Sequence, residues 1–209
     1  MMSAEEALEH LRAGNRRFAS DSTSGVVTSQ FRRSELAEGQ EPFAVVLGCS
    51  DSRVPAEIVF DQGLGDLFVI RVAGNIVAPS QIGSVEFAVE RFGTPLVVVL
   101  GHSRCGAILA TLDELTRSTE SRSKNLRSIV DRVRPSVQTL LATELRNDPA
   151  ALVAEAVRAN VRASVDRLRH GSESLELLLQ KNRLLVVGAE YSLETGVVQF
   201  FDDPGPIAL

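Results

Sequence analysis

The chain of 209 residues contains no tryptophan, one tyrosine and nine phenylalanines. It therefore offers few aromatic side chains on which nucleic acid bases can stack. A net charge of −5 also gives no electrostatic reason for binding nucleic acid or an anionic membrane. The basic pairs Arg16–Arg17 and Arg32–Arg33 are interpreted as solvated helix surface. We expect neither nucleic acid nor membrane as a partner.

Long apolar runs are missing as well. No run approaches the roughly 20 apolar residues that cross a bilayer, and the first segment, MMSAEEALEHLRAG, lacks the basic and apolar regions of a signal peptide. Hydrophobic residues make up 44% and charged residues 23% of the chain, as in ordinary globular domains. We expect one cytoplasmic domain over residues 1–209.

Only two cysteines are present. In a cytoplasmic chain two cysteines do not favour a structural disulfide, and the commonest fate of a lone cysteine is an inert buried thiol. The spacing of the cysteines and their neighbours has to decide between burial and chemistry.

The first 38 residues are predicted to form a helical arm. Ser3 followed by Glu6 is typical of a capping box that opens an amphipathic helix. The polar segment from Ser20 to Thr28 ends this helix, and a short helix around Phe31–Ala37 follows. Such an arm can pack on its own sheet or on a neighbouring subunit, and both remain open.

The remaining chain alternates between strand and helix patterns. Four continuous apolar runs indicate parallel strands covered on both faces: Phe43–Leu47, Leu67–Val72, Leu96–Leu100 and Leu184–Val187. Helices are predicted at about Ala56–Asp61, Ser80–Phe92 and Ala107–Leu115, followed by a long helical region broken by Pro135 and Pro149 and ending near Asn182. A glycine-containing turn after Tyr191 predicts an antiparallel edge strand at Val197–Phe201. The fold class is therefore α/β, with a mostly parallel central sheet flanked by helices.

Two of the predicted strands end in similar polar segments. Phe43-Ala-Val-Val-Leu-Gly48 leads into Cys49-Ser-Asp51-Ser-Arg53, and Leu96-Val-Val-Val-Leu-Gly101 leads into His102-Ser-Arg-Cys105-Gly106. We interpret the glycine at each exit as allowing a tight turn and a close approach to a bound species. Because ligands of open α/β sheets bind at the carboxyl ends of the strands, adjacent strands would bring Cys49, His102 and Cys105 together.

Two thiolates and one imidazole suit a tetrahedral zinc site whose fourth position holds water or substrate, which is the catalytic pattern. If the two cysteines were inert structural thiols, nothing would require both of them to lie in these two segments. If they formed a redox pair, we would expect the spacing Cys-x-x-Cys and no paired histidine. The sequence therefore predicts Zn²⁺ as the cofactor, bound by Cys49, His102 and Cys105. His10 and His170 are interpreted as surface or C-capping residues.

Asp51 and Arg53 lie two residues apart beside the first cysteine. In extended backbone such side chains share a face and can form a charge-assisted pair. Held by Arg53, Asp51 can orient zinc-bound hydroxide; released, it can become the fourth zinc ligand in a closed state. The alternative is a surface salt bridge worth about 0–1 kcal/mol.

The segments Cys49-Ser-Asp-Ser-Arg53 and His102-Ser-Arg-Cys105-Gly106 resemble the two signature segments of the β-class carbonic anhydrases. The resemblance covers nearly the whole chain and is weakest from about Leu115 to Val153. It continues through Leu11–Phe18, Val54–Glu57, Gly65–Arg71, Ala73–Asn75, Gly83–Ala88 and Val186–Tyr191.

This resemblance implies reversible hydration of carbon dioxide to bicarbonate and a proton. It implies the zinc ligands named above and a catalytic dyad of Asp51 and Arg53. It also implies that Gln62 and Gly106 bind substrate, although Gln62 is equally compatible with an exposed turn before Gly63. The family assembles as a homodimer or a dimer of dimers, with the N-terminal arm (residues 1–38) on a partner subunit and the cleft at the interface.

One departure from the family pattern concerns regulation. Some members bind inhibitory bicarbonate with a tryptophan three residues before the first zinc cysteine, where this chain has Val46. A bicarbonate switch of that form is not expected, whereas a switch of Asp51 governed by pH alone remains open. We expect activity to rise with pH, because two thiolates offset the charge of Zn²⁺ and leave its water less acidic.

Three other functions are compatible with parts of the pattern. The first is a related zinc hydrolase acting on carbon disulfide. The second is a non-catalytic zinc-stabilised scaffold or regulatory subunit, which would have no use for Asp51 and Arg53. The third is a nucleotide-binding domain, but Gly101-His-Ser-Arg-Cys-Gly106 lacks the three-glycine fingerprint.

Overall fold

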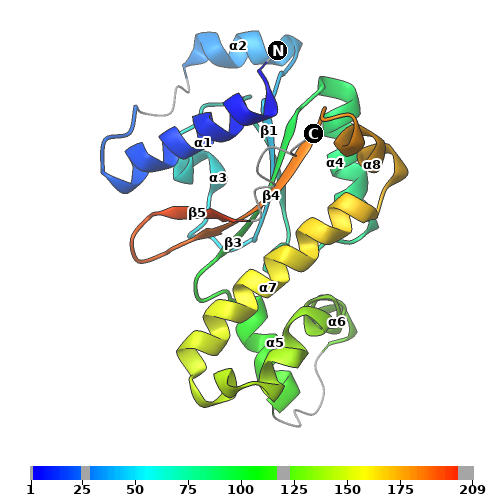
Figure 1. The fold of residues 1–209 in the computed structure, drawn as a ribbon. Helices are drawn as coiled ribbons and strands as arrows, with labels where there is room; N and C mark the ends of the chain where they lie inside the picture. The colour runs from blue at the N-terminus through cyan, green and yellow to red at the C-terminus, as the bar shows by residue number, and fades with distance from the viewer. Residues whose placement is uncertain (1, 25–28, 117–122, 202–209) are drawn as a thin grey trace.

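The computed structural model describes residues 2–24, 29–116 and 123–201. Its centre is a five-stranded sheet in the order β2-β1-β3-β4-β5, and Figure 1 shows this sheet between the flanking helices. The first four strands are parallel and β5 is antiparallel to β4. They span Leu67–Arg71 (β2), Ala44–Gly48 (β1), Leu96–His102 (β3), Leu185–Tyr191 (β4) and Val198–Phe201 (β5). The predicted fold class is confirmed.

The strands differ from the prediction mainly in length. Whereas the apolar run of β3 ends at Leu100, the strand continues through Gly101 to His102. This extension pairs with β4 in the register His102↔Tyr191. The polar residue His102 is therefore part of β3, because the backbone hydrogen bonds between strands do not require hydrophobic side chains.

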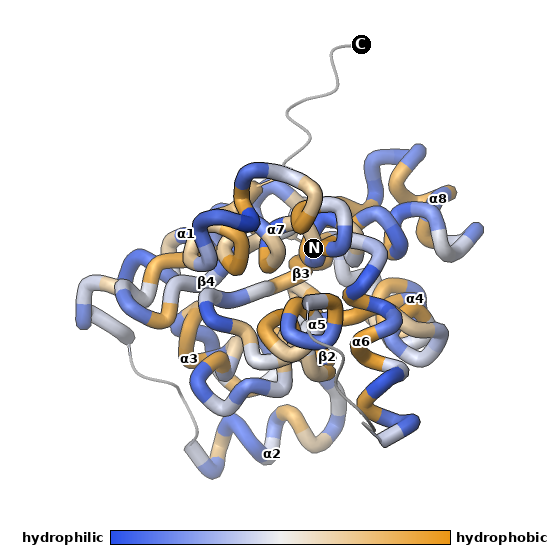
Figure 2. The backbone as a smooth tube through the Cα atoms, turned by 90° about the horizontal axis from the view of Figure 1, so that it is seen from below, coloured by the Kyte–Doolittle hydropathy of each residue, from blue (hydrophilic) through white to orange (hydrophobic). Residues whose placement is uncertain are grey.

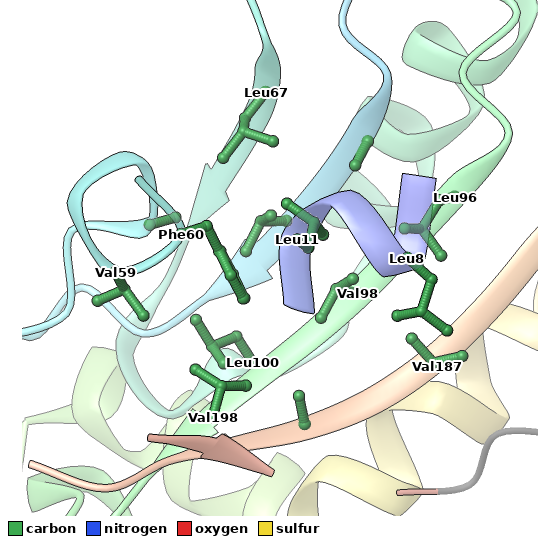
Figure 3. Packing of buried hydrophobic residues seen from close by; sticks show 14 of the residues in the cluster. Leu8, Leu11, Val59, Phe60, Leu67, Leu96, Val98, Leu100, Val187 and Val198 are labelled. Carbon is green, nitrogen blue, oxygen red and sulfur yellow. The ribbon is translucent and has the colours of Figure 1, made fainter. Parts of the chain in front are cut away.

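Helices cover both faces of the sheet, as continuously buried parallel strands require. On one face Val46, Val98 and Leu100 pack against α1 (Ala4–Ala19) and α3 (Ala56–Val59), as Figure 3 shows for part of the cluster. On the other face lie α4 (Pro79–Phe92), α7 (Pro149–His170) and α8 (Glu173–Gln180). Hydrophobic and hydrophilic stretches alternate along these helices (Figure 2), so each buries one side only.

Helix α1 begins at the predicted capping box, in which Ser3 and Glu6 bond each other's backbone. Its buried side packs on the sheet of its own chain through Ala7, Leu8 and Leu11. The second predicted arm helix is α2 (Gln30–Glu38), which has no buried residue. Part of the polar segment between the two helices lies outside the described residues. Packing of the arm on a partner subunit stays a prediction.

A third cluster covers the carboxyl ends of β1 and β3. It is formed by α5 (Gly106–Thr116), α6 (Lys124–Val137) and the first half of α7. Two 3₁₀ helices, η2 (Gln138–Ala142) and η3 (Glu144–Asn147), join α6 to α7, and η1 (Ala73–Asn75) follows β2. Both cysteines belong to this cluster.

The prediction that Pro135 breaks the helical region is wrong, since α6 continues through it to Val137. Pro135 lies in the last turn of α6. Proline has no backbone N–H, and the helix ends two residues after it. Pro149 is the first residue of α7, a position where proline loses nothing. Within the described part of the chain, no helix combines the length and the apolar character needed to span a membrane.

Candidate metal centre

The predicted ligands come together at the carboxyl edge of the sheet. Cys49 directly follows β1, His102 is the last residue of β3, and Cys105 directly precedes α5. Because β1 and β3 are hydrogen-bonded neighbours, the two segments meet. One ligand atom from each residue lies within 4.8 Å of the others, and the relative exposures of Cys49, His102 and Cys105 are 5%, 0% and 1%.

The donor atoms fit a soft tetrahedral cation such as Zn²⁺. The two sulfurs are 4.0 Å apart. Nδ1 of His102 lies 2.9 Å from the carbonyl oxygen of Ser103, so a proton on Nδ1 leaves the lone pair of Nε2 available. Nε2 is buried and has no hydrogen-bond partner among the described residues. A buried imidazole nitrogen is normally satisfied, and a metal ion would satisfy this one.

The two thiols lie within hydrogen-bonding distance of each other, and either sulfur can be the donor. The hydrogen bond with Cys105, opposed by burial and supported by the N–H of Gly74, lowers the pKa of Cys49 to about 4. The hydrogen bond to Cys49, together with burial, raises the pKa of Cys105. Cysteine binds metals as the thiolate, so a divalent cation would displace the remaining proton.

Asp51 and Arg53 form a two-pronged ion pair beside these ligands. The guanidinium donates from Nε to Oδ1 at 2.9 Å and from Nη2 to Oδ2 at 2.8 Å. These bonds hold the pKa of Asp51 well below its usual range. Oδ2 lies 3.8 Å from Nε2 of His102, so the carboxylate stands next to the ligands while Arg53 holds it.

The backbone reason given for this pair is wrong. Residues 51–53 are not extended: the Arg53 N–H donates to Oδ1 of Asp51 and the Val54 N–H donates to the Asp51 carbonyl. This turn, rather than a shared strand face, brings the two side chains together.

The interpretation of the two strand-exit glycines is also corrected. Gly48 and Gly101 are extended strand residues, and neither has a positive φ. A Cβ on Gly101 would lie 2.5 Å from Cγ2 of Val161. The absence of a side chain therefore allows α7 to pack against β3 at this position.

The other predicted site residues lie around the edge of this centre or away from it. Gln62 is buried, not exposed, and its Nε2 donates to the Phe60 carbonyl at 2.7 Å. Gly106 is the first residue of α5. Substrate binding by either residue stays a prediction. His10 and His170 are exposed, which confirms their interpretation as surface residues.

Several residues that hold the centre were not predicted. Arg71, at the end of β2, donates to the carbonyls of Cys49 and Asp51. Arg71 lies opposite Gly48 in the parallel register, which places it at the same sheet edge, but this register is not given by the sequence alone. The Gly74 N–H donates to the Cys49 sulfur at 3.3 Å, and Asn160 of α7 donates to the Gly74 carbonyl at 2.8 Å. The buried face of α7 also carries Ser164, so a buried asparagine on this mostly apolar face does not by itself identify its partner.

Comparison with known proteins places this geometry in a family. The carbonic anhydrase family model matches residues 44–198. The chain is 40% identical to carbonic anhydrase 2 of Mycobacterium tuberculosis over 201 residues, which is 96% of this chain and 94% of that protein. It is also 40% identical to the carbonic anhydrase of Mycolicibacterium smegmatis, with 96% and 95% covered.

Solved structures agree with this relationship. The β-carbonic anhydrase CafA of Aspergillus fumigatus superposes with a TM-score of 0.73 at 28% identity, covering 93% of this chain and 90% of that one. A Coccomyxa β-carbonic anhydrase in complex with acetazolamide gives 0.72 at 26% identity, covering 93% and 86%. The chain therefore belongs to the β-class carbonic anhydrases, a family of lyases.

Proposed function

We propose that this protein catalyses the reversible hydration of carbon dioxide to bicarbonate and a proton, with Zn²⁺ held by Cys49, His102 and Cys105. The observation that carries the proposal is the buried cluster itself. Two sulfurs converge with an imidazole nitrogen that has no hydrogen-bond partner among residues 2–24, 29–116 and 123–201, beside a carboxylate that an arginine orients. A structural zinc site normally has four protein ligands, whereas the described part of the chain offers three while Asp51 is bound to Arg53.

Hydration needs an oxygen nucleophile at neutral pH, and bound zinc would supply it by acidifying water. Asp51 is the residue that orients the nucleophile. Because Arg53 occupies one direction around each of its oxygens, Oδ2 keeps a lone pair toward the centre, 3.8 Å from His102 Nε2. That lone pair can accept a hydrogen bond from the attacking oxygen. The hydrogen bond would orient a lone pair of the attacking oxygen toward the carbon of carbon dioxide.

A closed state follows from the same geometry. Without Arg53, the Asp51 carboxylate is free to turn toward the ligands and serve as a fourth one, which would exclude water. With the ion pair intact, Asp51 would leave the remaining coordination position of a bound zinc ion open to water. We expect activity to rise with pH, measured as initial hydration rates; a flat profile from acid to alkaline pH would contradict this.

The proposal is tested on the purified full chain by measuring zinc content and stopped-flow carbon dioxide hydration. Cys49→Ser should lose both zinc and activity, because a hydroxyl is a much poorer zinc ligand than a thiolate. Asp51→Ala should keep zinc and lose about 100-fold in kcat, the usual contribution of a positioned acid–base group. Asp166→Ala, which removes an exposed aspartate of α7, is the matched control and should behave as wild type.

The same preparations separate the proposed reaction from its rivals. Hydrolysis of carbon disulfide without carbon dioxide hydration would favour the related hydrolase. Stoichiometric zinc with neither activity would favour a scaffold. Absence of zinc from the wild-type protein would overturn the metal centre and with it the reaction.

We further propose that the protein is cytoplasmic and assembles as a homodimer or a dimer of dimers. The Sordaria macrospora β-carbonic anhydrases are described as tetrameric, and one superposes with a TM-score of 0.73 at 24% identity, covering 93% of this chain and 96% of that one. Two observations on this chain support association: β2 is an edge of the sheet, and Phe87, which packs near Phe68 of β2, is 54% exposed. Light scattering of the purified chain would give the mass, and a monomer at micromolar concentration would contradict assembly.

A further inference from the structure

The turn between β4 and β5 lies against the loop that joins two of the proposed ligands, His102 and Cys105. Three hydrogen bonds attach Ser103 of this loop to the end of β4 and to the turn. Its N–H donates to the Tyr191 carbonyl at 2.9 Å, its hydroxyl donates to Oε2 of Glu194 at 2.9 Å, and the same hydroxyl accepts from the Leu193 N–H at 3.0 Å. The peptide at Ser103 is therefore held from both its backbone and its side chain.

The next loop residue, Arg104, is bound by the same carboxylate. Its Nε lies 2.8 Å from Oε1 of Glu194. Arg104 has a φ of 54°, a left-handed conformation that side chains other than glycine adopt at a cost. Such strain persists where surrounding contacts impose it. One glutamate thus bridges both residues that separate the two ligands, using one oxygen for each.

These contacts lead directly to the metal-binding atoms. The Ser103 carbonyl lies 2.9 Å from Nδ1 of His102, so the orientation of that carbonyl sets the ring and directs Nε2 toward the sulfurs. Cys105 follows Arg104, so the left-handed turn at Arg104 sets the direction in which the Cys105 side chain leaves the backbone. Displacement of the loop would move a nitrogen and a sulfur at once.

We propose that Glu194 is a positioning residue of the metal centre, which clamps Ser103 and Arg104 so that His102 and Cys105 present their ligand atoms in the geometry that zinc requires. This inference rests on the zinc site proposed above but not on the reaction. Glu194 touches neither a ligand nor the proposed substrate residues in any of these contacts, and it acts from the other side of the loop.

The alternative is an ordinary surface ion pair, which contributes little. Glu155 of α7 provides a matched example: it also pairs with an arginine, Arg162, at 3.2 Å, and its side chain is 38% exposed compared with 44% for Glu194. Glu155→Ala is therefore the control for Glu194→Ala. Glu194→Gln is the conservative variant, because its amide oxygen can still accept from Ser103.

The test compares these variants with the wild-type full chain in three measurements. Zinc affinity is obtained by competition with a chromogenic chelator, the geometry of the site from the visible absorption of the cobalt(II)-substituted protein, and stability of the metal-free form from urea denaturation. We expect Glu194→Ala to bind zinc about tenfold more weakly, the usual scale for loss of an outer partner of a metal ligand, and to change the cobalt spectrum. Glu194→Gln should recover only part of the affinity, because its one amide oxygen can replace the contact with Ser103 but not also the contact with Arg104, and Glu155→Ala should match wild type.

Two results would overturn the proposal. One is equal zinc affinity and an unchanged cobalt spectrum in Glu194→Ala and Glu155→Ala. The other is weaker binding accompanied by a lower urea midpoint of metal-free Glu194→Ala than of metal-free Glu155→Ala, which would assign the effect to general stability. If the wild-type protein binds no zinc, the proposed metal centre itself is contradicted. This result is separate from the test of Glu194, because the wild type is measured before any variant is compared.

Discussion

Gly14 shows how closely α1 approaches the chain beneath it. A Cβ at this position would lie 1.9 Å from the Phe60 carbonyl oxygen and 2.8 Å from Nε2 of Gln62. Glycine is unfavourable inside a helix, so its presence in α1 has a packing reason. The missing side chain allows the helix backbone to touch the segment that carries Gln62.

The substitution Gly14→Ala should therefore destabilise the protein although it raises helix propensity. Because backbone atoms must move to admit the methyl group, we expect a loss of about 1–3 kcal/mol in the free energy of unfolding, measured by urea denaturation. Gly83 of α4 is the control, since a Cβ there meets no atom within 4 Å. Gly83→Ala should stabilise by about 0.5–1 kcal/mol, and equal effects at both positions would contradict the explanation.

At the scale of elements, α1 is attached to the sheet by polar contacts as well as by its apolar side. Asn15 donates to the carbonyls of Val59 and Gly196 and accepts from the Val198 N–H. Arg17 forms an ion pair with the buried carboxylate of Asp61. These bonds join the helix to the α3 segment and to the β4–β5 hairpin, so α1 cannot shift without breaking several of them.

The Arg17–Asp61 pair makes the docking of α1 sensitive to acid. Burial opposes ionisation of Asp61, but hydrogen bonds from Arg17 and Ser24 prevail and lower its pKa from the ordinary value of 3.8. The folded state then binds fewer protons than the unfolded state, so this stabilisation is complete above the unfolded pKa and is lost as pH falls through the folded one. We expect Asp61→Asn to cost about 1.5–3 kcal/mol at neutral pH.

Thermal denaturation as a function of pH tests this linkage. The difference between wild type and Asp61→Asn should be constant above about pH 5 and should shrink toward about pH 3. Asp166→Asn, at an exposed pair of α7, should leave stability unchanged within about 0.5 kcal/mol. A difference between wild type and Asp61→Asn that did not vary with pH would exclude the ion pair as its source.

At the scale of the whole molecule, the metal centre joins parts of the chain that are distant in sequence. The two cysteines are 56 residues apart, and the third cluster of the core, built from α5, α6 and α7, packs around them. The unfolded chain does not hold these ligands in place, so zinc binding would stabilise the folded state.

Removal of zinc should therefore lower the melting temperature. At a free zinc concentration of about 1,000 times Kd, binding contributes about 4 kcal/mol. For a chain of this size we expect a chelator to lower Tm by roughly 10 °C, as followed by scanning calorimetry. In Cys49→Ser the chelator should have almost no effect, and an equal shift in both proteins would mean that the metal binds elsewhere.

Much of the fold could be predicted because its signals are local. The continuous apolar runs identified β1 to β4, and Ser3 with Glu6 located the first residue of α1. The wrong predictions used local sequence preferences at positions where contacts in the folded structure decide the conformation or the role of the residue. Gly101 appeared to form a turn but accommodates α7, and Asp51 appeared extended but lies in a turn.

By itself the sequence determined the α/β class and the candidate metal ligands, because each depends on residue type, spacing or hydrophobic period, whereas it indicated the pair of Asp51 with Arg53 without the turn that forms it. Only the tertiary structure decided which residues support them. Arg71, Asn160 and Glu194 contact the segments around the centre from β2, α7 and the β4–β5 turn, and no spacing in the chain encodes such meetings. They arise because the strand order of the sheet brings separate strand ends to one edge, where contacts depend on position in space rather than on distance along the sequence.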